Sequence, residues 1–122
     1  MGKLVIDALM DAGLAYASGN ANQIHVNATQ PTTRTEAVTT FQLASGTINS
    51  GDFTLLNGDA GGRKHTIGAQ AGLTIDTSGT ADHVSITSAT ELLIVTTCPG
   101  QVLTAAGTVD ISAFDQEIDD AA

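Results

Sequence analysis

The chain has 122 residues, a net charge of −9 and four basic residues, Lys3, Arg34, Arg63 and Lys64. This charge argues against nucleic acids and anionic membrane surfaces as partners, because both are bound through clusters of basic side chains. The length suits a single domain with a buried core, and an aromatic content of 3% means that this core must be aliphatic.

Residues 3–18 carry the pattern of an amphipathic helix. Apolar side chains recur at Val5, Leu9, Ala12 and Tyr16, a spacing that places them on one face. We expect this face to cover the domain's own core, and the Gly-Asn pair that follows the helix to end it. The alternative is a helix that packs on a neighbouring subunit.

Residues 23–28 alternate between polar and apolar side chains, which predicts the first strand. Successive side chains of a strand point to opposite faces. We therefore expect Ile24, Val26 and Ala28 to face the core and His25 to face outward.

A polar loop is expected at residues 29–36, where Pro31 favours an extended backbone before it. A second strand is expected at residues 40–43, with Phe41 and Leu43 inward. Residues 49–52 have the composition of a turn.

Residues 51–97 form the longest patterned stretch, in which short apolar segments are separated by Gly-, Asp-, Asn- and Ser-rich turns. Strands with turn signals at such intervals are typical of antiparallel sandwiches or barrels rather than βαβ units. The expected strands centre on residues 53–56, 65–67, 73–75, 83–87 and 92–95.

Residues 100–107 have the composition of a sheet edge and turn, and residues 108–112 alternate like a further strand. Phe114 and Ile118 anchor a last extended segment, and residues 119–122 form an acidic tail. We interpret this acidic end of the chain as solvated, or alternatively as a docking patch. The sequence thus predicts one domain over residues 1–122, a mainly β, antiparallel β-sandwich or barrel-like fold with one N-terminal amphipathic α-helix.

Cys98 is the single cysteine, so an internal disulfide and a cysteine-based metal framework are excluded. We expect it to pack as a small residue in the core or at a strand end. The apolar run at residues 4–6 is too short for a secretion signal, and no segment is long enough to span a membrane. We therefore expect the protein to be made and folded in a cytoplasm.

The Gly-rich turn at residues 58–66 lacks the spacing of a phosphate-binding loop, and we interpret it as a hairpin turn. Asp52, Asn57 and Asp59 lack the register of a calcium loop. We interpret these three residues as turn formers.

The three histidines, His25, His65 and His83, lie on separate expected strands without a closely spaced partner ligand, so we expect them at the sheet surface rather than on zinc. Asp82, His83 and Ser85 are adjacent in sequence, but a regular strand would point Asp82 away from the other two. We expect no enzyme activity, no metal and no cofactor.

Several segments resemble a family of small structural proteins of tailed bacteriophages, often met in siphophage genomes. The segments cover most of the chain and include QPTTRTEAVTTFQLAS, SGDFTLLNGDAGGRK, TSGTADHV, LLIVTTC and LTAAGTVDISAFDQEI. None of them is a chemical motif; they specify turns and strand edges. The resemblance implies a virion protein without enzyme activity.

The most direct implication of the resemblance is a capsid decoration (cement) protein, which binds the outer surface of the capsid and stabilises contacts between major capsid protein subunits. Its partners would be the major capsid protein and possible further copies of itself. A tail or neck component is the alternative, and a host-surface adhesin is disfavoured because the chain has no Trp and one Tyr. The candidate capsid contacts lie on the N-terminal helix, on the loop after the first strand and on the turn near residue 63: Val5, Leu9, Tyr16, Pro31, Arg34, Arg63 and Lys64.

Overall fold

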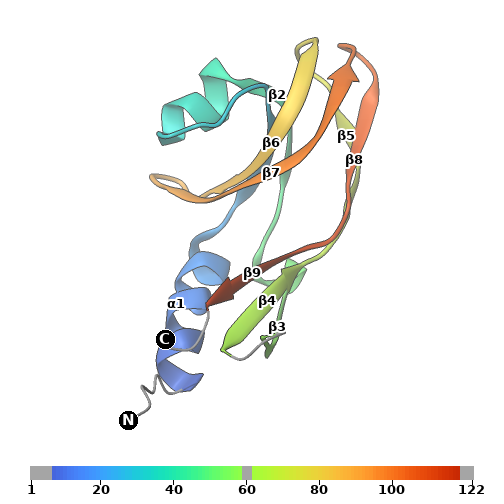
Figure 1. Cartoon of the computed structure of the whole chain (residues 1–122). Coiled ribbons are helices and arrows are strands. Elements are labelled where there is room, and N and C mark those ends of the chain that lie inside the picture. The colour runs from blue at the N-terminus through green and yellow to red at the C-terminus, as the bar shows by residue number, and fades with distance from the viewer. Residues whose placement is uncertain (1–6, 59–61, 119–122) are drawn as a thin grey trace.

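The structure is a computed structural model that describes residues 7–58 and 62–118. It confirms a mainly β, sandwich-like fold with one N-terminal helix (Figure 1). Each pairing of strands within these residues is antiparallel.

Within the described residues, the chain forms one α-helix, nine strands and two short helices of other types, which are numbered separately as η1 and η2. The elements are α1 (Asp7–Asn20), β1 (Gln23–Asn27), η1 (Glu36–Thr40), β2 (Gln42–Thr47), η2 (Ser50–Asp52), β3 (Phe53–Asn57), β4 (Arg63–Ile67), β5 (Gln70–Thr74), β6 (Gly79–Thr87), β7 (Leu92–Leu103), β8 (Thr108–Ile111) and β9 (Phe114–Ile118).

Three sheets build the body. The largest has the strand order β2-β1-β6-β7, and the others are β3-β4-β9 and the pair β5-β8. A bridge between Ala44 of β2 and Ile75 joins the first sheet to the β5 segment. Figure 1 shows α1 beside β9, β4 and β3 at one end of the molecule, with β5 and β8 along the side of the larger sheet.

An aliphatic cluster fills the space between the sheets, as the low aromatic content requires. β-Branched side chains from β1, β6 and β8 dominate it, and these residue types pack well on a pleated surface. The large members of the cluster are Ile24, Val26, Leu43, Ile48, Ile67, Ile75, Val84, Ile86, Ile94, Leu103, Val109 and Ile111.

The helix is present, but our prediction of its buried face is wrong. Met10 and Leu14 are 1% and 2% exposed, whereas Leu9 and Tyr16 are 65% and 54% exposed. An ion pair between Asp11 and Arg63 of β4, at 2.7 Å, holds the helix in this rotation. Residues 3–6 of the expected helix lie outside the described residues.

The strand expected at residues 40–43 begins two residues later, because residues 36–40 form the π-helix η1. Asn27 holds this turn against the sheet: its amide donates to the Ala37 carbonyl at 3.0 Å, and its oxygen accepts from Ser85 at 2.6 Å. Leu43 is buried as expected, while Phe41 is half-buried.

The expected turn at residues 49–52 is confirmed as the 3-10 helix η2. The Asn49 side chain accepts from the Gly51 amide at 2.8 Å, and the Asp52 carboxylate accepts from the Asn49 amide at 2.9 Å. This is a capping box, which satisfies amide groups that a helix start leaves unpaired. The chain then enters the β3–β4 hairpin, in which Asn57 pairs with Arg63. Residues 63–66 of the turn expected at residues 58–66 belong to β4, and residues 59–61 lie outside the described residues.

β7 is longer than predicted. It continues from Leu92 through Cys98, Pro99 and Gly100 to Leu103 and pairs with β6 at both ends. Cys98 therefore lies within a strand rather than at its end, and it packs against the core, which was the other position that we expected for it. The sheet edge and turn expected at residues 100–107 are confirmed, as the end of β7 at Leu103 and the turn after it. Proline is tolerated here because β7 is the edge of its sheet, where one side of the strand donates to no neighbour.

Candidate functional site

The outer face of α1 carries two of the predicted contact residues, Leu9 and Tyr16. They stand seven residues apart, which places them on one side of the helix. The Tyr16 hydroxyl donates to the Glu91 carboxylate, and this hydrogen bond, together with the charge of Glu91, raises the pKa of Tyr16. Leu9 and Tyr16 thus form a solvent-facing apolar surface on a helix whose other side is anchored. Val5, on the same expected face, lies outside the described residues.

β3 presents a second exposed apolar pair that the sequence did not reveal as surface. Leu55 and Leu56 are 45% and 44% exposed, although neighbouring side chains of a strand point to opposite faces. Among the described residues β4 is the one strand that pairs with β3, which therefore stands at the edge of its sheet, and both leucines remain partly exposed there. The sequence signal was the absence of alternation at Leu55 and Leu56, from which we predicted a strand but no exposed pair.

Pro31 and Arg34 lie in the loop between β1 and η1, and this loop is packed rather than free. Pro31 is buried, and the Arg34 Nε donates to the Ser88 carbonyl at 2.9 Å. The Glu36 carboxylate accepts from both the amide and the hydroxyl of Thr32, and these hydrogen bonds lower the pKa of Glu36. We therefore assign Pro31 and Arg34 a role in holding this loop.

Arg63 also serves the fold itself. Besides its ion pair with Asp11, its Nη1 donates to the Asn57 side chain at 2.5 Å. Its side chain is 17% exposed. Arg63 therefore joins α1 to the β3–β4 hairpin, and little of its charge faces solvent.

Lys64, the next residue of β4, lies 3.1 Å from the Asp115 carboxylate of β9. Asp115 also accepts from the Thr66 hydroxyl at 2.7 Å. The hydrogen bonds from Thr66 and Lys64 lower the pKa of Asp115. Part of the acidic C-terminal region is thus tied to the β4 strand, while residues 119–122 lie outside the described residues.

His25 is buried, so its expected position on the outer face is wrong. Its Nδ1 lies 2.6 Å from Gln42 Oε1 and its Nε2 lies 2.9 Å from the Thr87 hydroxyl. Because the amide oxygen can only accept, Nδ1 carries the proton and Nε2 accepts from Thr87. Burial lowers the pKa of His25, and the charge of Arg34 lowers it further, against the opposing effect of the Gln42 hydrogen bond.

His65 is likewise buried, at 2% exposure, and our surface assignment for it is wrong as well. Its ring centroid lies 4.8 Å from that of Phe53, and its Nε2 has no hydrogen-bond partner in the part of the chain that the structure describes. Burial lowers the pKa of His65. His65 thus contributes an aromatic ring to the packing of the β3–β4 sheet.

Asp82 and His83 contact each other, contrary to our expectation from regular strand geometry. The His83 Nδ1 lies 2.7 Å from Asp82 Oδ1. The register of β6 against β7 shifts between Ala81 and His83, and this irregularity places neighbouring side chains together. Ser85 bonds to Asn27 instead, so these three residues do not form a relay of hydrogen bonds.

Within residues 7–58 and 62–118, no three His, Cys, Asp or Glu side chains are grouped so that they could hold a metal ion. The same residues contain no helix that is both long and apolar enough to cross a membrane.

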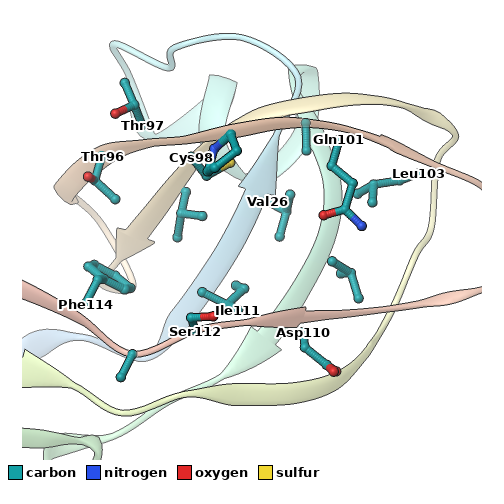
Figure 2. A pocket seen from close by; sticks show the side chains of 15 residues that line it. Val26, Thr96, Thr97, Cys98, Gln101, Leu103, Asp110, Ile111, Ser112 and Phe114 are labelled. Atoms are coloured by element: carbon teal, nitrogen blue, oxygen red, sulfur yellow. The ribbon is translucent and has the colours of Figure 1, made fainter.

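A groove of about 390 Å³ opens between β7 on one side and β8 and β9 on the other (Figure 2). Val26, Ala81 and Val84 form its floor. Cys98 and Leu103 of β7 line one wall and Ile111 and Phe114 line the other. Burial raises the pKa of the Cys98 thiol, and the nearby Asp82 charge raises it further. The sequence did not reveal this groove, because it depends on which strands end up as edges.

Comparisons with protein-family models, with curated proteins and with solved structures found no match to this chain.

Proposed function

We propose that this protein is a structural component of a tailed-bacteriophage particle, a decoration (cement) protein that binds the outer surface of the capsid and stabilises contacts between major capsid protein subunits. The resemblance of its turn and strand-edge segments to small phage structural proteins supports this proposal. The geometry that supports it best is an uneven distribution of exposed apolar side chains.

Of the five large apolar side chains that are exposed among the described residues, four lie on α1 and β3: Leu9, Tyr16, Leu55 and Leu56. Both elements belong to the end of the molecule built around the β3-β4-β9 sheet (Figure 1). Scattered single apolar side chains need no explanation, but a concentration at one end is typical of an interaction surface.

Contacts within the chain also hold this end together. Met10 and Leu14 are the buried side chains that anchor α1 to the domain, and the Arg63–Asp11 ion pair links the helix to the β3–β4 hairpin. A preorganised surface loses little conformational entropy on binding. A cement protein that binds assembled shells but not free subunits stabilises the shell by mass action, and many identical sites on one particle multiply a modest affinity.

The direct test is a cryo-EM map of the native particle of the phage whose genome encodes this chain. We expect density for the domain on the outside of the shell, repeated with the symmetry of the capsid. Density confined to a ring at the neck or tail would instead assign the protein to the alternative class, and absence from the particle would refute both.

A variant tests the surface. We expect the double substitution Leu9→Ser and Leu55→Ser to weaken binding to shells assembled from the major capsid protein by tenfold or more, because two apolar anchors leave the contact. Co-sedimentation with shells measures this. Val102→Ser is the matched control, since Val102 is 77% exposed and lies near the end of β7, in a different sheet from β3. Equal binding of both variants would exclude this end as the contact.

A further inference from the structure

The groove between β7 and the β8–β9 segment is a gap between strand edges. β7 pairs with β6, β8 pairs with β5, and β9 pairs with β4, and each of these strands has one paired neighbour among the described residues. Every second residue of such an edge directs its N–H and C=O groups away from its neighbour. Both walls of the groove therefore offer backbone groups of the kind that bind an extended polypeptide.

The interior of the groove suits alternating side chains. Its floor is the apolar surface of Val26, Ala81 and Val84, and Phe114 stands at the β9 side. Figure 2 shows Cys98, Gln101 and Leu103 along β7, facing Ile111 and Ser112 across the gap. A strand laid between the walls would place every second side chain on this floor.

The charged residues at the groove favour an occupant with positive charge. None of its lining residues is Lys, Arg or His, whereas Asp110 is among them. Asp82 lies close enough to influence the Cys98 thiol electrostatically, although its carboxylate also contacts His83. With a net charge of −9 for the whole chain, an acidic or phosphate-bearing occupant is disfavoured.

We propose that this groove binds an extended, cationic segment of a partner protein, which adds as a strand beside β7 and places apolar side chains on the floor. The segment would alternate apolar residues with residues that include Lys or Arg. This proposal concerns the groove alone and does not depend on capsid decoration.

The test uses the full chain and a synthetic, end-capped peptide of alternating valine and lysine. We expect the peptide to shift the backbone amide NMR signals of residues 96–103 and 108–114, and to slow hydrogen exchange of β7 amides, because new backbone hydrogen bonds protect them. Absence of these changes up to the solubility limit of the peptide would overturn the proposal.

Two control peptides separate the contribution of charge from that of backbone hydrogen bonds. A valine–glutamate peptide should bind much more weakly, because its charges have the wrong sign. A valine–lysine peptide interrupted by proline should also bind weakly, because proline removes donors of the added strand. Equal binding of the proline peptide would indicate an apolar pocket without strand addition, and signals that change with protein concentration alone would indicate a second copy as the occupant. Both results contradict the proposal.

Two chemical readouts map the contact. The double variant Asp82→Asn and Asp110→Asn should weaken peptide binding roughly two- to tenfold, since two exposed charge contacts are lost. Asparagine at position 110 retains an oxygen that can accept from the Gly72 amide, as Asp110 does at 2.8 Å. Bound peptide should also slow alkylation of Cys98. Asp76→Asn is the matched control, since Asp76 is exposed and does not line the groove, and it should leave both readouts unchanged. Unaltered alkylation at saturating peptide would place the peptide outside the groove.

Discussion

Two imidazole rings lie in the interior of this domain, and they differ in how their nitrogens are satisfied. Both ring nitrogens of His25 have partners, Gln42 and Thr87, whereas the Nε2 of His65 has none. Burial lowers the pKa of each ring below its ordinary value of 6.5. Each histidine is therefore held neutral in the folded chain, since a charged ring would have to give up its hydration.

The first prediction concerns acid stability. Below about pH 6.5 the unfolded chain takes up protons on both rings and the folded chain resists them, so the unfolded state binds more protons. The free energy of unfolding should fall as the pH drops below that value, by at most about 1.4 kcal/mol per histidine per pH unit. The loss from Glu36 and Asp115, whose pKa values are lowered, follows at still lower pH. Urea unfolding at a series of pH values measures both.

His65→Leu tests the assignment of this slope. The variant removes one buried ring with an unpartnered nitrogen, so we expect its free energy of unfolding at neutral pH to be little changed. Between neutral pH and pH 5, its free energy of unfolding should fall clearly less than that of the unsubstituted chain. An unchanged slope in His65→Leu would show that this ring does not titrate on unfolding.

At the scale of elements, α1 has one anchored side and one free side. Met10 and Leu14 are buried, and Leu9, next to Met10 in sequence, is largely exposed. The helix therefore belongs to the domain's own core on one side and offers a surface on the other. Both functions that we considered for it from the sequence can coexist, because a helix has separate faces.

The second prediction follows from these faces. Met10→Ala and Leu14→Ala should each lower the free energy of unfolding by about 2–5 kcal/mol, because each removes buried apolar atoms and leaves a cavity. Leu9→Ala should change it by less than about 0.5 kcal/mol, as expected of a surface site. Chemical denaturation measures all three.

Leu9→Ala is also the matched control here, since it makes the same kind of truncation on the same helix. If Leu9→Ala is as destabilising as Met10→Ala, the helix packs in a different rotation. Deletion of residues 1–20 should destabilise the rest of the domain for the same reason, so surface substitutions are the better test of partner binding.

At the scale of the whole molecule, negative charge and exposed apolar side chains would contribute separately to the binding that we propose. Three of the four basic residues, Arg34, Arg63 and Lys64, are engaged in contacts within the chain. A partner would therefore meet a chain with a net charge of −9 whose Arg34, Arg63 and Lys64 are already paired within the chain. Long-range charge governs the rate of encounter, and desolvated apolar contacts govern the lifetime of a complex.

The third prediction separates these two effects on binding to capsid shells. Raising the salt concentration from low to physiological should slow association with shells, roughly tenfold, and leave dissociation nearly unchanged. The Leu9→Ser and Leu55→Ser variant should instead speed dissociation. Surface-based kinetics on immobilised shells resolve the two rates. Association that is insensitive to salt would show that charge does not guide the encounter.

Local pattern was sufficient for much of the fold. The alternation at Ile24 and Val26, the hairpin turn before Arg63 and the capping residues at Asn49 and Asp52 act over a few residues, so their structural consequence could be predicted. The same holds for the existence of the N-terminal helix.

The predictions that failed depended on distant partners. His25 is inside because Gln42 and Thr87 come to it from other strands, and β7 extends past Cys98 because β6 continues beside it. The ion pairs of Arg63 with Asp11 of α1 and of Lys64 with Asp115 of β9 were not predicted, because each joins residues about fifty positions apart. The exposure of Leu55 and Leu56 was not predicted either, because it depends on the position of β3 at the edge of its sheet.

The sequence by itself determined the class of the fold, the position of its turns, the aliphatic character of its core and the sign of its charge, because these depend on composition and on contacts between near neighbours. The tertiary structure decided which face of α1 is free, which strands are edges, and where the groove beside β7 lies. Those features arise from burial and from pairing between residues far apart in the chain, and no short stretch of sequence contains both partners.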